Sequence, residues 1–109
     1  MTRTGLAAVF AFLLLLSGTG AAQVMLHSGT ITATHLNGEV PLRGPCIRTE
    51  PAAPTTWICL YQTNTVYDET REALQTAQLL RQQCLFSWST VDVAGFAVLS
   101  TLECSQHGQ

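Results

Sequence analysis

The sequence contains no lysine, which excludes a lysine nucleophile and Schiff-base chemistry. It also lacks a cluster of basic side chains, because its five basic residues are scattered arginines, outnumbered by seven acidic residues. A domain that binds nucleic acid or an anionic membrane surface needs a basic patch. We therefore expect no nucleic-acid partner and no attraction to a membrane surface.

A long hydrophobic run is lacking too. The apolar stretch Leu6–Leu16 is well short of the roughly twenty residues that a membrane-spanning helix needs. It follows the positive Arg3 and precedes the small residues Ser17–Ala22, which is the three-part layout of a secretory signal peptide. We expect residues 1–22 to be removed, which leaves 23–109 as a single secreted or periplasmic domain with no membrane contact. An uncleaved membrane anchor is the alternative.

Closely spaced cysteines are also absent. A structural zinc site usually has cysteines two to four residues apart, and thioredoxin-like chemistry needs a Cys-x-x-Cys motif. An even number of cysteines in a short exported chain indicates disulfides instead, and a domain that buries only about 60% of its unfolded surface commonly needs them. We therefore expect two structural disulfides, no metal and no cofactor. The cysteines are Cys46, Cys59, Cys84 and Cys104.

The register of a predicted hairpin favours one pairing of the first two cysteines. The strand-like segments "CIRTE" and "TTWIC" flank the loop Pro51–Pro54, in which a leading proline presets the turn. Antiparallel pairing across this loop places Cys46 opposite Cys59, at a Cα separation of about 4.5–5.5 Å that a disulfide can bridge. The same register places Arg48 opposite Trp57, where a cation–π contact is plausible.

A second hairpin is predicted around the loop Val93–Gly95, where glycine supplies the left-handed conformation. Counting outward from this loop brings Cys84 opposite Cys104. Leu99 falls on the outer face. The inner face carries Phe86, Trp88, Phe96, Val98 and Leu102.

Residues 89–102 also admit a helical alternative. Ser89–Asp92 resembles a capping box, and apolar residues recur after it at helical spacing. The valines and Gly95 favour strands, so we prefer the hairpin. The helix, if formed, would remove the geometric support for the second disulfide.

One helix is predicted from Asp68 to about Gln83. Asp68 suits the N-cap position, and acidic residues in the first turns are favoured by the helix dipole. Apolar residues then recur at helical spacing. The expected buried stripe comprises Ala73, Leu74, Ala77, Leu80 and Cys84.

A further hairpin is predicted near the start of the mature chain. Ile31 and His35 alternate with threonines, and Asn37-Gly38 is a strong two-residue turn signal. The returning strand runs through Glu39 and is kept short by a following proline. The complete prediction is a small disulfide-stabilised α+β domain, with antiparallel hairpins packed on one α-helix in the order ββββαββ.

The sequence carries no catalytic motif, so function is predicted only as a class. We expect a small exported protein-binding module whose partner is another protein: an inhibitor, an immunity or neutralising protein, or a secreted interaction factor. Rigid hairpins favour binding because they reduce the entropy lost on association. The candidate contact residues, whose composition resembles that of recognition loops, are Pro51, Pro54, Trp57, Tyr61, Asn64 and Tyr67.

Other interpretations remain open at this stage. The segment Tyr61–Tyr67 could be an ordinary connection between a strand and a helix. A small secreted hydrolase such as a ribonuclease-like enzyme could use His35, Glu39 and Arg43 around the first hairpin. A structural component of the envelope is the third alternative.

Overall fold

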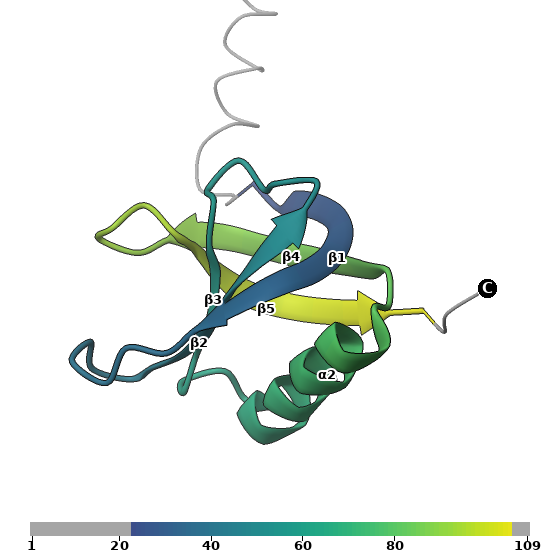
Figure 1. The fold of residues 1–109 in the computed structure, drawn as a ribbon. Coiled ribbons are helices and arrows are strands. Elements are labelled where there is room, and N and C mark those ends of the chain that lie inside the picture. Colours follow the sequence, from purple (N-terminus) through teal and green to yellow (C-terminus); the bar gives the residue numbers. More distant parts are fainter. Residues whose placement is uncertain (1–22, 106–109) are drawn as a thin grey trace, which may run out of the picture.

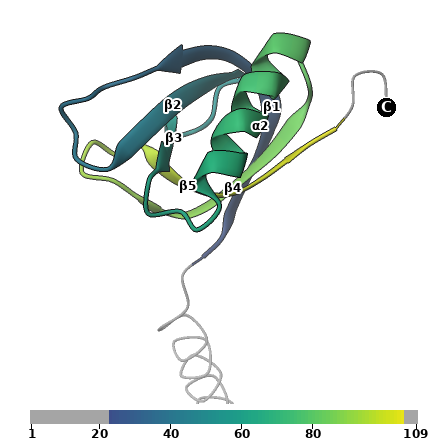
Figure 2. The same ribbon diagram turned by 90° about the horizontal axis from the view of Figure 1, so that it is seen from below.

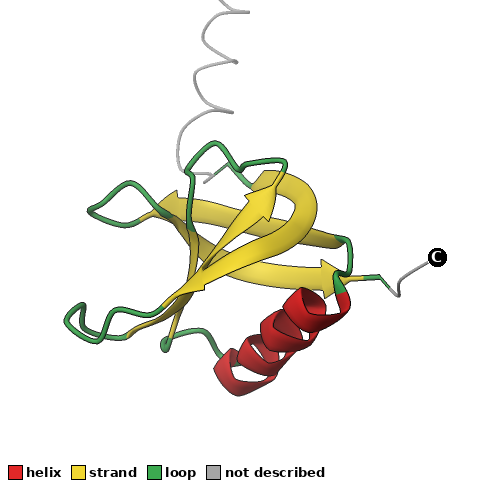
Figure 3. Ribbon diagram, in the orientation of Figure 1, coloured by secondary structure: helices red, strands yellow, loops and turns green. Residues whose placement is uncertain are grey.

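The computed structural model describes residues 23–105, so the predicted signal peptide (residues 1–22) lies outside the described part. Five strands and one helix make up a small α+β domain, as predicted (Figure 3). Their order is βββαββ, with one strand fewer before the helix than expected. The elements are β1 (Met25–His35), β2 (Arg43–Glu50), β3 (Ile58–Tyr61), α2 (Tyr67–Leu80), β4 (Cys84–Val91) and β5 (Ala97–Cys104).

The five strands close into a barrel in the order β1-β2-β3-β5-β4 (Figure 1). All neighbouring strands are antiparallel except β3 and β5, which run parallel. The long β1 closes the barrel because its first half pairs with β4 and its second half with β2. The connection from β3 to β4 contains α2, which lies along one side of the barrel (Figures 1 and 2). This strand order and helix position are those of the OB-fold, a five-stranded Greek-key barrel.

None of the helical structure in the described residues is long and apolar enough to cross a membrane.

The predicted hairpin at Asn37-Gly38 is wrong. The strand β1 pairs directly with β2, with His35 opposite Cys46, and residues 36–42 form a loop between them. The side chain of Asn37 accepts a hydrogen bond from the backbone N–H of Glu39 at 2.9 Å. This side-chain-to-backbone bond organises the loop locally, so that no ladder forms after the Asn-Gly pair.

Both predicted disulfides are confirmed. Cys46 bonds to Cys59 and Cys84 to Cys104, and in each case the two residues are directly opposite in an antiparallel pair of strands. The cation–π contact is also formed, with the guanidinium of Arg48 5.3 Å from the centre of the Trp57 ring. Each cross-link restricts the unfolded chain and contributes about 3 kcal/mol to stability.

The hairpin β4–β5 follows the predicted register from Cys84–Cys104 to Ser87–Thr101 and again at Val91–Ala97, with an irregular stretch between. Irregularities after Ser87 shift the pairing, so that Trp88 lies opposite Leu99. A shift of one residue exchanges the two faces of a strand. Leu99 is consequently buried in the core, 2% exposed, whereas Val98 is only half-buried. The prediction that Leu99 faces outward was therefore wrong, and the helical alternative for residues 89–102 is not formed.

The helix is shorter than predicted and buries a different face. It ends at Leu80 rather than near Gln83, and Arg81 caps it in a left-handed conformation with φ of 55°. Ala73 is exposed and Leu80 is 52% exposed, so the predicted stripe was only partly correct. The residues that the helix buries are Thr70, Leu74 and Ala77.

The core lies inside the barrel and is closed on one side by α2. Leu74 and Ala77 of the helix join the buried side chains of the strands. Burying one large apolar side chain contributes about 1.5–3 kcal/mol. The largest apolar side chains that are fully buried are Phe86, Ile47, Ile58 and Leu60.

Candidate functional site

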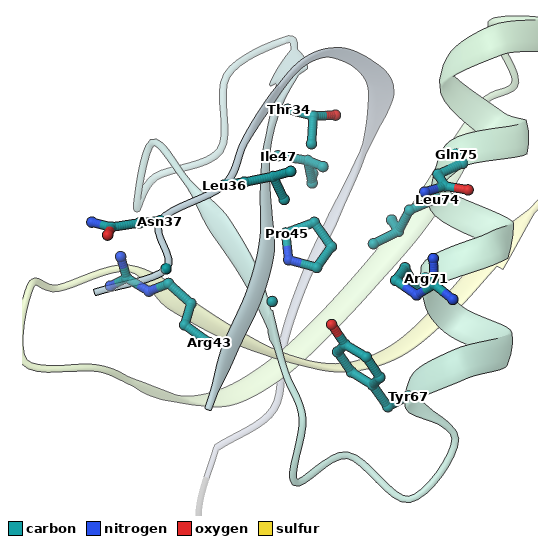
Figure 4. A pocket seen from close by; sticks show the side chains of 12 residues that line it. Thr34, Leu36, Asn37, Arg43, Pro45, Ile47, Tyr67, Arg71, Leu74 and Gln75 are labelled. Carbon is teal, nitrogen blue, oxygen red and sulfur yellow. The ribbon is translucent and has the colours of Figure 1, made fainter. Parts of the chain in front are cut away.

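A pocket of about 350 Å³ lies between the 36–42 loop, the start of β2 and α2 (Figure 4). We call it the helix pocket. Its volume is at the lower end of the range typical of ligand-binding sites. Its walls are formed by Leu36, Gly44, Pro45, Ile47, Tyr67 and Leu74. Its polar groups come from Thr34, Asn37, Arg43, Arg71 and Gln75.

The local geometry of two elements explains why these side chains meet. Successive residues of a strand point to opposite faces, so Pro45 and Ile47 share one face of β2. Tyr67, Arg71 and Leu74 are four and then three residues apart, which places them on one face of α2. Figure 4 shows the strand residues on one side of the helix pocket and the helix residues on the other.

The position of Tyr67 depends on a glycine in β2. The Tyr67 ring lies against the backbone of Gly44. A β-carbon added to Gly44 would lie only 2.8 Å from Cε1 of Tyr67 and 2.8 Å from the carbonyl oxygen of Leu60, so it would overlap both. Only glycine permits such an approach between a ring and a strand. Gly44 thus keeps the aromatic side of the helix pocket close to β2.

A buried ion pair borders the helix pocket. Arg43 donates a hydrogen bond to Asp92 at 2.7 Å, and the Tyr61 hydroxyl donates to the same carboxylate oxygen at 2.8 Å. The side chains of Arg43 and Asp92 are 7% and 8% exposed. The guanidinium also lies 5.5 Å from the centre of the Phe96 ring. The charge of Arg43 is therefore already compensated.

This network changes the acidity of both charged groups. Burial on its own would raise the pKa of Asp92, but the hydrogen bonds from Tyr61, Arg43 and the backbone N–H groups of Phe96 and Ala94 outweigh it, so the pKa lies below its usual value. Hydrogen bonds with Tyr61 and Asp92 raise the pKa of Arg43. The pair accordingly stays ionised at neutral pH.

Arg71 is the second arginine of the helix pocket, and its charge is not compensated in this way. Within residues 23–105 the pair Arg43–Asp92 is the single ion pair with an N···O distance of 4 Å or less. Arg71 is half-buried on the helix side of the pocket. An apolar cavity with one available guanidinium suits a ligand that is apolar at one end and anionic at the other.

The predicted contact residues of the β2–β3 connection lie outside the helix pocket. Pro51 and Pro54 are exposed in that connection. Trp57 is half-buried and contacts the Arg48 guanidinium and the His35 ring, whose centre is 5.7 Å from its own. These three side chains come from β1, from β2 and from the residue that precedes β3, and they form a separate cluster on the barrel.

The segment between β3 and α2 is held to the barrel by hydrogen bonds. The Asn64 amide donates to the carbonyl oxygens of Leu99 and Ser100 at 3.3 and 3.2 Å, and its oxygen accepts from the N–H of Val66 at 2.9 Å. Asn64 thus orders the approach to the helix. The prediction of Asp68 as N-cap was wrong, because the N-cap is Val66, which has no side-chain cap, and Asp68 lies in the first turn of α2. Of the predicted contact residues, Tyr67 alone lines the helix pocket.

The three residues considered for a hydrolase have different partners. Arg43 pairs with Asp92, His35 packs on Trp57, and Glu39 is exposed in the 36–42 loop. In the part of the chain that the structure describes, no group of three or more histidine, cysteine or acidic residues is arranged to hold a metal ion.

No protein-family model matches the sequence, and no curated protein or solved structure shows significant similarity to it. The OB-fold topology supports many unrelated functions, so it does not assign one to this chain. The helix pocket and its surroundings are therefore the features of this chain that can indicate a function.

Proposed function

We propose that the protein is an exported protein-binding module and that the helix pocket receives an apolar side chain of its partner. The observation that carries the proposal is the combination of apolar walls with a polar rim in one pocket. Protein interfaces are commonly anchored in this way, by a side chain that fills a pocket while polar groups surround it.

The rigidity of one wall supports this function. The strand β2 is bonded to β3 through Cys46–Cys59, and Arg43 ties its start to Asp92 beyond β4. A wall that is held in place before binding loses little conformational entropy on association.

The two disulfides indicate an oxidising, extracellular-type environment, because such bonds are rare where thiols are kept reduced. The signal peptide predicted for residues 1–22 supports the same location. A secreted or periplasmic partner protein is therefore proposed.

Affinity capture with matched variants tests this function. The disulfide-bonded protein is immobilised and exposed to the envelope and culture fractions of the cells that export it. Leu36 lines the pocket and is 72% exposed, so Leu36→Glu alters the site with little effect on folding. Leu79 is 80% exposed on α2 outside the helix pocket, and Leu79→Glu is the control.

We expect wild type and the Leu79→Glu protein to retain the same defined protein, and Leu36→Glu to retain about tenfold less. Equal retention by all three proteins would contradict the role of the helix pocket. Turnover of RNA or peptide substrates that survives Leu36→Glu but is lost in His35→Ala would favour the hydrolase alternative instead.

A further inference from the structure

We infer that the helix pocket selects a partner segment in which an apolar side chain lies next to a carboxylate, and that Arg71 binds this carboxylate. The inference rests on the proposed protein-binding function and specifies its ligand chemistry. The apolar walls of the helix pocket hold the side chain, and the guanidinium of Arg71 binds the carboxylate.

The two arginines of the helix pocket differ in whether a carboxylate already compensates their charge. Arg43 shares its guanidinium with Asp92 and Tyr61, so an incoming anion would have to compete with a bonded carboxylate. Arg71 meets no carboxylate within 4 Å in the described region. A half-buried guanidinium beside apolar walls binds an anion more strongly than an exposed one, because less water screens the pair.

A second observation is the position of the hydrogen-bond donors on α2. Arg71 and Gln75 stand one turn apart on the same face of α2 and both line the helix pocket. A guanidinium presents two parallel N–H groups to a carboxylate, and the amide of Gln75 adds a further donor. Both residues lie on the helix side of the helix pocket, and Pro45 and Leu36 line its other side (Figure 4). An apolar group and a carboxylate can thus be held together.

The third step is size. A volume of about 350 Å³ accommodates one apolar side chain and an adjacent carboxylate. The proposed protein-binding function places this group on a peptide segment of a partner protein rather than on a free lipid, and octanoate is the probe that distinguishes the two.

Small probes test this chemistry directly. The ¹⁵N-labelled protein, with both disulfides formed, is titrated by NMR with N-acetyl-leucine and, separately, with N-acetyl-leucinamide. The two probes share the apolar side chain and differ only in the carboxylate. We expect saturable shifts at Leu36, Tyr67 and Arg71, and a dissociation constant about fivefold lower for the acid.

A charge-removing variant isolates the contribution of Arg71. In Arg71→Gln the preference for the acid should disappear, while the affinity for the amide stays unchanged. Arg81→Gln removes the arginine that follows the last turn of the same helix, outside the helix pocket, and should keep the preference. This readout does not depend on the overall stability of either variant, since each is compared between two probes.

Equal affinity for acid and amide, or a preference that persists in Arg71→Gln, would overturn the inference. Octanoate binding more tightly than N-acetyl-leucine would overturn the choice of a peptide over a lipid. If the acid and the amide bind equally well but capture of the partner still depends on Leu36, only this inference is wrong and the proposed function stands. If the Leu36→Glu protein captures the partner as well as wild type does, the proposed function itself is wrong.

Discussion

At the scale of single residues, the network around Asp92 determines how the strand carrying one wall of the helix pocket is anchored. The carboxylate accepts hydrogen bonds from Arg43 and Tyr61 on one oxygen and from two backbone N–H groups on the other. This arrangement could not be predicted from the sequence, because Arg43 and Asp92 are 49 residues apart in the chain and no local pattern links them. Only barrel closure brings them together.

Asp92→Asn should destabilise the protein by about 1–3 kcal/mol, because it removes the ionic partner of a largely buried guanidinium. Chemical denaturation monitored by tryptophan fluorescence measures this change. Tyr61→Phe is the matched control that keeps the ion pair and removes the two hydrogen bonds of the Tyr61 hydroxyl, which donates to Asp92 and accepts from Arg43. Its expected loss is about 1 kcal/mol. An unchanged midpoint in Asp92→Asn would show that the pair does not contribute to stability.

The pKa of Asp92 predicts a pH dependence. Its pKa in the folded protein lies below the unfolded value of about 3.9. The carboxylate therefore contributes stability that is fully present above about pH 4 and is lost as the pH falls toward the lowered pKa. Thermal unfolding between about pH 2 and pH 6 should show a shallower acid decline in Asp92→Asn than in wild type. Parallel curves for the two proteins would contradict this assignment.

At the scale of elements, the accuracy of the predicted strand pairing depends on how far apart in the sequence the paired segments lie. Local hairpin arithmetic predicted both disulfides, since each joins two strands that are consecutive in the chain and paired in the expected register. It failed for Asn37-Gly38, because β1 pairs with β2 across the loop 36–42 rather than across a two-residue turn, and for Leu99, because an irregular pairing changes the face without any signal in the composition. The helix pocket could not be predicted, although the spacing of Tyr67, Arg71 and Leu74 marks its helical side.

The contact between Gly44 and Tyr67 gives a prediction for the packing of α2 on β2. Gly44→Ala should cost about 1–3 kcal/mol, because the added methyl group overlaps the Tyr67 ring and the Leu60 carbonyl oxygen. It should also weaken binding of N-acetyl-leucine by displacing the ring. Thermal denaturation and the NMR titration measure the two effects.

A double variant provides the control for this steric account. Adding Tyr67→Leu to Gly44→Ala should recover part of the lost stability, so that the two changes are not additive. Gly38→Ala, at a position where a β-carbon meets nothing within 4 Å, should leave stability nearly unchanged. Additive effects of the first two substitutions would contradict a direct clash.

At the scale of the whole molecule, closure of the barrel allows a small hydrophobic core to stabilise the folded domain. The strand β1 pairs with two neighbours, and the parallel contact of β3 with β5 completes the circle. The sequence predicted an α+β domain with two cross-links but not its closure, because a parallel contact between distant strands leaves no local pattern. The disulfides lie on opposite parts of this circle, one between β2 and β3 and one between β4 and β5.

Removing the second disulfide should lower the free energy of unfolding by about 3 kcal/mol. The variant Cys84→Ser/Cys104→Ser leaves the helix pocket chemically intact, because neither cysteine lines it. Urea denaturation measures the loss, and the probe titration in the folded range should give the wild-type acid preference. A variant that is as stable as wild type would show that barrel closure alone determines stability.

The order of the cysteines has a consequence for how the chain matures. The first cysteine bonds to the second and the third to the fourth. If the chain is exported as proposed, an oxidant that joins cysteines in their order of emergence from a translocation channel makes the native bonds directly, and no enzyme that reshuffles mispaired thiols is required. We expect cells that lack a disulfide isomerase but keep a dithiol oxidase to produce this protein in normal yield.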